Sequence, residues 1–390
     1  MRIGVLTFHR AINYGAVMQA YSMVERLKRD FPQDSVEIID YNCAAREWFK
    51  LKCPLVFVYR RGLKQAWQKM CQTRIFNKFV KTLPLSRNLV WKGNKKVQSY
   101  IAAHYDVVVV GSDAVFNWND LGLPNVYFLA DAQGVCKMSY AASAHLQFFD
   151  RVTEEQKAYL CKCLTDFQYI GVRDENTKKF VTDVTGGKQT ALHNCDPTVF
   201  LQMDFPEMAL QRKLKKHGFD FKKKTVFVML MHPTYAQYAR RYFGEDVQIV
   251  ALMDGNREAD IYLHDLNPFE WAHVLKLGAC LITDYFHGTL LSLKNGTPVM
   301  SIDASGYCNE QYESKARDIL VRRLDIPELY VHADELQGEQ GYATFARRLD
   351  VILNGFDPQK VKNALQAEAD SYNSFCNYLK EARRQYECEI

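Results

Sequence analysis

The sequence predicts an α/β fold with parallel sheets divided between two domains, and three observations carry this prediction. Short apolar runs alternate with segments of helical periodicity along most of the chain, which is the pattern of parallel strands joined by helices. The chain has 390 residues, more than one hydrophobic core usually serves. Around residues 202–224 the apolar pattern is broken by Pro206, Gly218 and a cluster of lysines, which marks the boundary between the domains.

The first predicted domain opens with a strand, a loop and a helix. The run "RIGVLTF" forms the strand, and Val17, Tyr21, Val24 and Leu27 recur after it at helical spacing. Further strands are predicted at "VEIID", at the valine run of "YDVVVVGSD", at "MSYAAS" and at "YIGVRD", with a helix at "ENTKKFV". The unbroken valine run indicates a strand covered on both faces, as in a parallel sheet.

The second predicted domain repeats this alternation. Strands are predicted at "KTVFVML", "VQIVALM", "CLITD" and "PVMSI", and helices at "FEWAHVLKLG" and "FHGTLLSLKN". The chain then closes with one long helix, because Asp357 and Pro358 provide a cap and a first-turn proline. The apolar face of this helix is formed by Val361, Leu365, Tyr372, Phe375 and Leu379.

The composition describes a globular protein of the cell interior. Hydrophobic residues make up 48% of the chain and charged residues 24%, and no apolar run reaches the ~18 residues that span a bilayer. The opening sequence becomes polar too quickly for a signal peptide. The 11 cysteines show no zinc-ligand spacing, so we expect reduced thiols in a cytoplasmic protein and no metal site.

Residues 46–100 form a basic block in an otherwise acidic chain. The block has 14 lysines and arginines against the single acid Glu47, a balance of +13, and the rest has 36 basic and 44 acidic residues, a balance of −8. Leu63, Trp67, Met70 and Arg74 lie along one stripe of a predicted helix. Such a helix either rests on an anionic membrane surface or packs on its own domain with its charges solvated. No reading module is recognisable, so we expect no nucleic acid as a partner.

Polar residues follow five of the predicted strands, at the point where each strand ends. Ligands of parallel α/β sheets collect at the carboxyl ends of the strands, so these residues are the candidates for a binding site. One such cluster would be ordinary turn chemistry, but five of them, with an arginine and a histidine included, predict a ligand-binding cleft. The candidates are Asn13, Tyr14, Gly15, Ser112, Asp113, Arg173, Asp196, Asp284, Tyr285, His287, Gly288 and Thr289.

His287 falls in the first turn of the helix predicted at "FHGTLLSLKN". The backbone N–H groups and the dipole of such a turn attract anions, and Gly288 would let a ligand approach the backbone closely. The structural alternative is a histidine that caps the helix or packs in the core. Spacing alone leaves both interpretations open.

The other candidates also have structural alternatives. Arg173 can hold a carboxylate or phosphate in a two-pronged hydrogen bond, or pair with an acid at the start of the following helix. Residues 13–15 either contact a substrate or form a turn before a helix, and Ser112 and Asp113 either bind substrate hydroxyls or act as helix caps. The chain has no G-x-G-x-x-G, P-loop or G-x-S-x-G motif, so dinucleotide binding, nucleotide hydrolysis and α/β-hydrolase chemistry lack their usual support.

The ordered set of these stretches resembles the polysaccharide pyruvyl transferase family. The similar segments are "GVLTFHRAINYGAVMQAYSM", "VVVVGSDAVFNW", "SYAASA", "GVRDENTKKFV", "CDPTVFL", "NPFEWAHVLKLGACLITDYFHGTLLSLKNGTPV" and "SKARDILVRRL", and they span roughly residues 3–325. The resemblance implies a fold similar to GT-B glycosyltransferases, with two Rossmann-like domains facing a cleft. It implies domains at 1–205, with the basic insertion 46–100, and at 206–340, and a helical segment at 341–390 that packs back on the first domain.

The resemblance also implies a reaction. Such an enzyme transfers the pyruvyl group of phosphoenolpyruvate to two hydroxyls of a sugar in a cell-surface polysaccharide or its lipid-linked precursor, forms a pyruvate ketal and releases phosphate, without a cofactor. His287 aligns with the family's general acid, and Arg173 aligns with an arginine that holds an anionic end of the donor. We therefore expect a cytoplasmic enzyme, peripheral on the membrane if residues 46–100 bind lipid.

One position departs from the family pattern. Some members have arginine two places before the histidine, where this sequence has Tyr285. Because the donor has two anionic ends, a second clamp must then come from Arg10, Lys315 or Arg317. Two rival functions stay open: an inverting glycosyltransferase that uses a nucleotide-sugar, since the two-domain fold serves both, and a non-catalytic relative that binds glycans, which the tyrosine favours.

Overall fold

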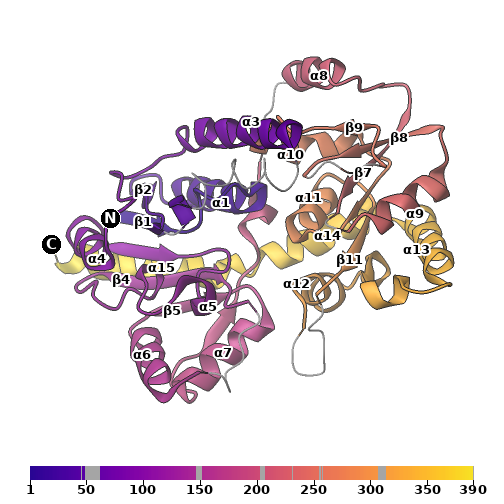
Figure 1. Ribbon diagram of the computed structural model, residues 1–390. Helices are drawn as coiled ribbons and strands as arrows, with labels where there is room; N and C mark the ends of the chain where they lie inside the picture. The colour runs from indigo at the N-terminus through magenta and orange to yellow at the C-terminus, as the bar shows by residue number, and fades with distance from the viewer. Residues whose placement is uncertain are drawn as a thin grey trace. The chain divides into compact units, whose positions relative to one another are not determined.

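The structure is a computed structural model that describes the chain except for residues 45, 49–61, 146–151, 203–206, 231, 254–255, 257, 306–312 and 390. The elements form two compact units (Figure 1). The first unit comprises Met1–Cys53, Val80–Leu201 and Ala369–Ile390, and the second comprises Pro54–Phe79 and Gln202–Glu368. Each unit contains one parallel sheet, so the α/β prediction is confirmed.

The first unit is built on six parallel strands in the order β2-β1-β3-β4-β5-β6. The strands are β1 (Arg2–Leu6), β2 (Ser35–Ile38), β3 (Val107–Val110), β4 (Cys136–Ala142), β5 (Tyr169–Val172) and β6 (Ala191–His193). Every residue of the valine strand β3 is buried, because β3 lies inside the sheet and both of its faces are covered. The strands predicted for this half of the chain are confirmed.

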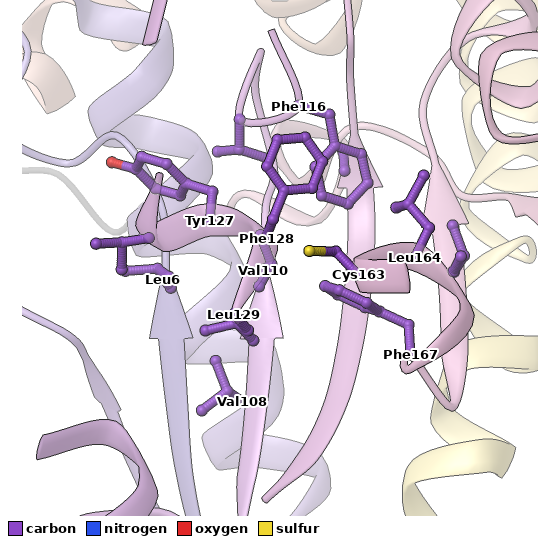
Figure 2. Packing of buried hydrophobic residues seen from close by; sticks show 14 of the residues in the cluster. Leu6, Val108, Val110, Phe116, Tyr127, Phe128, Leu129, Cys163, Leu164 and Phe167 are labelled. Carbon is purple, nitrogen blue, oxygen red and sulfur yellow. The ribbon is translucent and has the colours of Figure 1, made fainter. Parts of the chain in front are cut away.

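Helices of the first unit connect and cover these strands. They are α1 (Tyr14–Asp30), α4 (Asn94–His104), α5 (Trp118–Leu121), α6 (Glu154–Thr165), α7 (Glu175–Thr185) and α15 (Tyr372–Glu389), with 3-10 turns η1 (Val126–Phe128) and η3 (Pro197–Phe200). Aromatic rings pack the core between η1 and α6 (Figure 2). Phe116 stacks on Phe128 at 5.3 Å and meets Phe167 edge-on at 6.0 Å between ring centroids.

The second unit has the strand order β12-β11-β10-β7-β8-β9, which is a doubly wound Rossmann-like sheet. The strands are β7 (Lys224–Met229), β8 (Val247–Ala251), β9 (Ile261–Tyr262), β10 (Cys280–Thr283), β11 (Val299–Asp303) and β12 (Tyr330–His332). The helices are α3 (Leu63–Val80), α8 (Glu207–Lys216), α9 (Thr234–Phe243), α10 (Pro268–Val274), α11 (Phe286–Lys294), α12 (Lys315–Arg317), α13 (Gly341–Gly355) and α14 (Pro358–Ala369). Short 3-10 or π turns are η4 (Leu275–Leu277), η5 (Asp318–Arg323), η6 (Pro327–Leu329) and η7 (Ala333–Leu336).

Helix α3 groups with the second unit, although the sequence analysis placed all of residues 46–100 in the first domain. Two aromatic contacts explain this difference. The ring of Phe79 meets Phe269 edge-on with 4.9 Å between centroids, and the ring of Trp67 lies 5.7 Å from His264. Part of the basic block, residues 49–61, lies outside the described residues.

The predicted long C-terminal helix is two helices, α14 and α15, separated at residues 370–371. Ser371 explains the break, because its carbonyl accepts from Asn194 Nδ2 at 2.9 Å and its hydroxyl accepts from the backbone N–H of Cys195 at 2.8 Å. After the break, the ring of Tyr372 packs under the Arg26 guanidinium at 4.3 Å. Of the segment 341–390, only α15 therefore packs on the first unit, whereas α13 and α14 belong to the second.

The helices show no membrane-crossing element. Among the residues that the structure describes, none of the helices combines the length and the apolar composition that spanning a bilayer requires.

Candidate functional site

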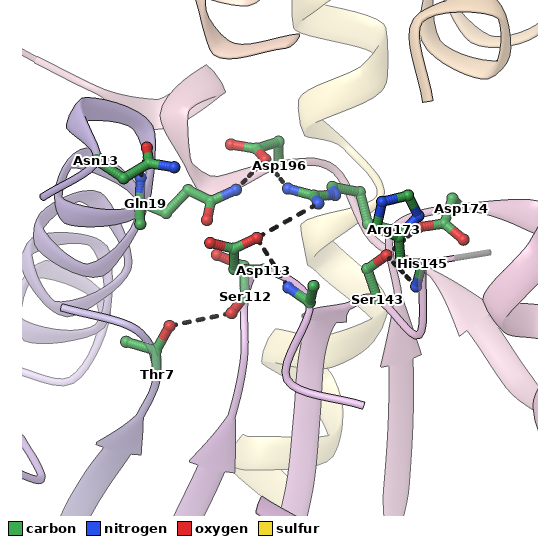
Figure 3. Close-up of polar contacts among 12 residues, drawn as sticks. Thr7, Asn13, Gln19, Ser112, Asp113, Ser143, His145, Arg173, Asp174 and Asp196 are labelled. Atoms are coloured by element: carbon green, nitrogen blue, oxygen red, sulfur yellow. Dashed lines mark hydrogen bonds and ion pairs between the residues drawn. The ribbon is translucent and has the colours of Figure 1, made fainter. Parts of the chain in front are cut away.

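The carboxyl ends of the strands in the first sheet gather the polar residues predicted for this half of the chain. The strand order reverses between β1 and β3, and such a switch point is where parallel α/β sheets leave room for a ligand. Asn13 follows β1, Ser112 and Asp113 follow β3, and Arg173 follows β5. Figure 3 shows these side chains at one edge of the sheet.

Arg173 is the centre of a buried ion-pair network at this edge (Figure 3). Its side chain is 5% exposed, Nη1 donates to Oδ2 of Asp196 at 2.7 Å, and Nη2 lies 3.9 Å from Oδ1 of Asp113. The neighbouring Asp174 caps helix α7 and accepts from Ser143 Oγ at 2.6 Å. Arg173 therefore donates to the carboxylate that follows β6, and Asp174 at the start of the next helix adds a charge interaction.

The network around Arg173 has more carboxylates than cations. One guanidinium interacts with Asp113, Asp174 and Asp196. Burial lowers the pKa of Arg173, but the three carboxylates outweigh burial and raise it. An anion that binds here must compete with these carboxylates for Arg173, whereas neutral hydroxyl groups find both donors and acceptors.

Gln19 joins this network from helix α1, and the sequence analysis missed it. Its side chain is fully buried, and Nε2 donates to Oδ2 of Asp196. The signal that identifies Gln19 is an amide side chain at a position on the buried face of helix α1. Within the described ranges, Gln19 Oε1 and Ser112 Oγ are buried atoms without a hydrogen-bond partner. These two atoms are therefore suited to meet the hydroxyl groups of a ligand.

The turn after β3 presents Asp113 at the rim of the network. Asp113 has a φ of 79°, and its Oδ1 accepts from the backbone N–H of Ala114 at 2.8 Å. The carbonyl of Ser112 accepts from Thr7 Oγ1 at 3.0 Å, which ties the turn to the end of β1. Left-handed conformations of residues other than glycine concentrate at functional sites. With 17% of its side chain exposed, Asp113 is the carboxylate of this network that a ligand reaches most easily.

The loop after β1 has structural roles. Asn13 Oδ1 accepts from the backbone N–H of Ala16 at 3.1 Å and caps α1, so the turn interpretation of residues 13–15 has direct support. Tyr14 and Gly15 are buried in the first turn of the helix. Asn13, one of the predicted substrate contacts in this loop, therefore has a structural function as the cap of α1.

Arg10, a candidate for the second anion clamp, is engaged by Asp40. Arg10 Nε and Nη2 donate to the two oxygens of Asp40 at 2.5 and 2.7 Å, and His9 Nε2 lies 2.9 Å from Oδ1. Burial raises the pKa of Asp40, but the hydrogen bonds from His9 and Arg10 outweigh burial and lower it to about 2. Arg10 therefore neutralises a buried carboxylate of its own unit.

His287 lies at the switch point of the second sheet. The strand order reverses between the neighbouring strands β7 and β10. Helix α11 begins three residues after β10 ends. His287 is 5% exposed, and its ring centroid lies 5.8 Å from that of Tyr285 and 5.2 Å from that of Phe286. Tyr285 occupies the cap position, so His287 is not the helix cap. It is nearly as buried as a core residue, and only a small part of it meets solvent.

The turn between β10 and α11 is held by Thr283. Its hydroxyl donates to the carbonyl of Met229 at 3.0 Å and accepts from the backbone N–H of Tyr285 at 2.9 Å. The predicted site residue Asp284 is half-buried beside it, and its backbone N–H donates to the same Met229 carbonyl at 3.2 Å. Burial and the charge of Asp284 raise the pKa of Tyr235. The Asp284 carboxylate therefore faces the α9 side of this edge.

Gly288 and Thr289, both predicted to contact the substrate, serve the packing of α11. A Cβ at Gly288 would lie 2.9 Å from Met229 Sδ and 3.0 Å from Thr283 Oγ1, so glycine lets the helix approach β7 and β10. Thr289 is fully buried, and its hydroxyl donates to Ser301 Oγ at 2.9 Å. Close helix–sheet packing gives these two residues a structural role, and their contact with a substrate stays a prediction.

Arg317 lies in the short helix α12, which Ser314 caps with a 3.0 Å hydrogen bond to the Arg317 backbone N–H. The Arg317 side chain is 49% exposed, with Nε at 3.7 Å from Glu313 Oε1. This distance is that of an ion pair longer than a hydrogen bond, and about half of the Arg317 side chain meets solvent. In the described part of the chain, no group of three His, Cys, Asp or Glu side chains is placed to hold a metal ion.

Comparison with protein families finds a match over most of the chain. The sequence model described as polysaccharide pyruvyl transferase matches residues 13–306. This range contains Arg173 and His287 but not Lys315 or Arg317. A comparison with curated protein sequences finds no match.

Solved structures of similar fold include two epimerases and a glycosyltransferase. The UDP-GlcNAc 2-epimerase of Methanocaldococcus jannaschii has 11% identity and a TM-score of 0.54, covering 94% of this chain and 99% of that chain. The enzyme of the same name from Neisseria meningitidis, bound to UDP-GlcNAc, has 9% identity and a TM-score of 0.52, covering 99% and 100%. A glycosyltransferase from Rickettsia africae has 9% identity and a TM-score of 0.53, covering 99% and 97%. These likenesses establish a GT-B-like fold with two Rossmann-like domains.

Proposed function

We propose that this chain, which belongs to the polysaccharide pyruvyl transferase family, transfers the pyruvyl group of phosphoenolpyruvate to two hydroxyls of a sugar. The sugar belongs to a cell-surface polysaccharide or to its lipid-linked precursor, and the product is a pyruvate ketal. The observation that carries the proposal is the place of His287, in the first turn of α11 at the switch point between β7 and β10.

The reaction needs one proton donor. A sugar hydroxyl attacks C2 of phosphoenolpyruvate as the methylene carbon C3 is protonated, which turns the C2–C3 double bond into a C–CH₃ bond. The second hydroxyl then attacks C2 and the C2–O bond to phosphate breaks. The two hydroxyls release two protons. One replaces the proton that the acid gave to C3, and the other leaves with the phosphate.

In this proposal His287 protonates C3, and the rings of Tyr285 and Phe286 beside it limit the access of water. Protonation of an enol carbon creates positive charge on C2, which a water molecule would trap as readily as a sugar hydroxyl. A largely buried imidazole beside two aromatic rings favours transfer over hydrolysis, because few water molecules reach the reacting carbon. A positioned general acid contributes a factor of roughly 10²–10⁴ to the rate.

In this proposal Arg173 binds an anionic end of the donor, and Asp113 binds an acceptor hydroxyl. Asp196 holds the guanidinium in place at 2.7 Å, which orients its remaining N–H bonds before the substrate arrives. Asp113, 3.9 Å from Nη2, accepts a hydrogen bond from a sugar hydroxyl and aligns it. Gln19 Oε1 and Ser112 Oγ offer further partners for the sugar.

The second anionic end of the donor needs another cation. Tyr285 stands where some family members have arginine, and Arg10 is engaged by Asp40. Lys315 and Arg317 remain of the three candidates, and the half-exposed guanidinium of Arg317 gives the geometry of a two-pronged clamp. A cytoplasmic location belongs to the same proposal.

A rival function has one observation in its favour. Two epimerases and a glycosyltransferase share the fold, so an inverting glycosyltransferase that uses a nucleotide-sugar is the second candidate. A non-catalytic relative that binds glycans is the third candidate, because Tyr285 stands where some family members have arginine.

A binding comparison separates these functions, and an activity assay then tests the first. The melting temperature is measured in three separate samples, one with phosphoenolpyruvate, one with UDP-GlcNAc and one with polysaccharide. A ligand at a hundredfold excess over its dissociation constant stabilises the folded state by about 2.7 kcal/mol. We expect stabilisation by phosphoenolpyruvate, and phosphate release only when an acceptor sugar is added. Stabilisation by the nucleotide-sugar alone would assign the chain to the second function.

A further inference from the structure

Helix α3 has one face packed against its unit and an opposite face that carries exposed apolar side chains. Phe76, Phe79 and Val80 are buried, and Phe79 contacts Phe269. On the outward side, Leu63 is 77% exposed and Met70 is 54% exposed. The outward side therefore leaves large apolar side chains only partly covered by the unit to which the helix belongs.

The exposed apolar residues of α3 form a continuous stripe. Leu63, Trp67 and Met70 are spaced by four and three residues, which places them on one side of two successive turns. Trp67 is 59% exposed although its ring contacts His264. Three large apolar side chains within eight residues exceed the scatter of single exposed apolar residues on an ordinary surface.

Basic side chains accompany this stripe without any acid. The sequence of α3 contains Lys64, Lys69, Arg74 and Lys78 and neither aspartate nor glutamate. Lys64, Arg74 and Lys78 are exposed, and the outward stripe continues through Arg74 beyond the apolar residues. A face that joins tryptophan, leucine and methionine to lysine and arginine matches the two layers of an anionic lipid surface, acyl chains and phosphates.

We propose that the outward face of α3 binds an anionic phospholipid surface, with Leu63, Trp67 and Met70 inserted at the level of the headgroups. Lys64, Arg74 and Lys78 then contact lipid phosphates. Because the helix has 18 residues, it is about 27 Å long and lies in the plane of the interface. This inference does not depend on the proposed function, although an enzyme acting on lipid-linked sugars would gain from the same contact.

The charge of the helix argues against a second copy of the chain as the occupant. In a symmetric dimer the same face meets itself, which would bring two helices of charge +4 together with no acid on either. An anionic lipid surface supplies the missing negative charge at every position along the helix. The lipid is therefore the better partner for both the apolar and the basic residues.

Vesicle co-sedimentation of the full chain without substrate tests the proposal. Vesicles of phosphatidylcholine alone are compared with vesicles of phosphatidylglycerol and phosphatidylcholine in equal parts, at low and high salt. We expect binding to the anionic vesicles that weakens with salt. The variant Lys64→Gln/Arg74→Gln/Lys78→Gln should bind on the order of a hundredfold more weakly, since each basic side chain contributes about fivefold.

The apolar stripe is tested with its own variant and a matched control. Leu63→Gln/Met70→Gln should lower binding at least tenfold, whereas Met208→Gln/Val351→Thr, which replaces exposed residues of α8 and α13, should bind like the unmodified protein. All of these side chains are exposed, so circular dichroism and the melting temperature should not change. Equal binding by the stripe variant and the control, or a dimer in the absence of lipid that the stripe variant dissociates, would overturn the proposal.

Discussion

The two sheets end in edges of different chemistry. At the edge of the first sheet, Arg173, Asp196 and Gln19 are joined by hydrogen bonds and ion pairs over the carboxyl ends of the strands. At the edge of the second sheet, Tyr285 and Phe286 surround His287 with aromatic rings. Both edges lie at the switch point of a parallel sheet, so topology alone does not decide what such an edge does.

In the proposed function, this difference separates the positioning of the substrate from its reaction. The polar groups of the first edge hold one another and therefore contribute to the stability of their unit as well as to binding. Helix α11 at the second edge is anchored by Gly288 and Thr289, which pack on the sheet, so residues other than His287 hold this helix in place. Substitutions at the first edge should therefore change stability most, and substitutions at the second edge should change activity most.

Replacing the imidazole gives the largest expected effect and tests the second edge. His287→Ala should lower phosphate release from phosphoenolpyruvate in the presence of acceptor by roughly 10²–10⁴-fold, because the reaction loses its general acid. Binding of phosphoenolpyruvate should persist, because the anion clamps remain. The release of phosphate and the melting temperature are measured on the same preparation.

A histidine on an exposed helix of the first unit provides the control. His104→Ala removes an imidazole that stacks on Tyr100, and it should leave turnover unchanged. Turnover by His287→Ala at the rate of this control would remove His287 from the mechanism and break the comparison between the two edges.

Removing a carboxylate from the first edge tests whether that edge stabilises its unit. Asp196→Ala leaves the buried guanidinium of Arg173 without its hydrogen-bonded partner at 2.7 Å. Breaking a buried pair from one side costs about 3–5 kcal/mol, so the free energy of unfolding should fall by that amount in urea denaturation.

The matched control is Asp183→Ala in helix α7 of the same unit. Its carboxylate pairs with Lys179 four residues earlier on the surface, and such pairs contribute about 0.3–0.5 kcal/mol. If Asp196→Ala and Asp183→Ala lose equal stability, the network around Arg173 does not hold the first unit together.

The sequence predicted the sheets and the polar residues at their carboxyl edges because both depend on local patterns. Apolar runs identify buried strands, and the polar residues that follow them, such as Ser112 and Arg173, lie at one edge because parallel strands end there. The pairing of Arg173 with Asp196 was not predicted, because it depends on β5 and β6 being neighbours. Gln19 was missed for a similar reason, since its partner is 177 residues away.

Other features required knowledge of packing. Gly288 and Thr289 follow a strand, like true ligand contacts, but the closeness of α11 to β7 and β10 gives them a structural role. The grouping of α3 with the second unit rests on contacts such as that of Phe79 with Phe269, which periodicity does not reveal. The break before α15 depends on hydrogen bonds that Ser371 accepts from the β6 loop.

The pH dependence of stability sharpens the account of the first edge with the smallest expected effect. His9 and Arg10 lower the pKa of Asp40 from 3.8 to about 2, so the folded state binds this proton less tightly than the unfolded state. The resulting stabilisation, about 2 kcal/mol, is complete above the unfolded pKa and is lost as the pH falls through the folded one. Asp40→Asn should therefore cost about 2 kcal/mol at neutral pH and about half of that at pH 3, in urea denaturation at both pH values. Asp183→Asn is the control for a surface carboxylate, and its effect on the free energy of unfolding should not change between the two pH values. If the loss of stability caused by Asp40→Asn stays constant with pH, the charge of Asp40 does not stabilise this edge.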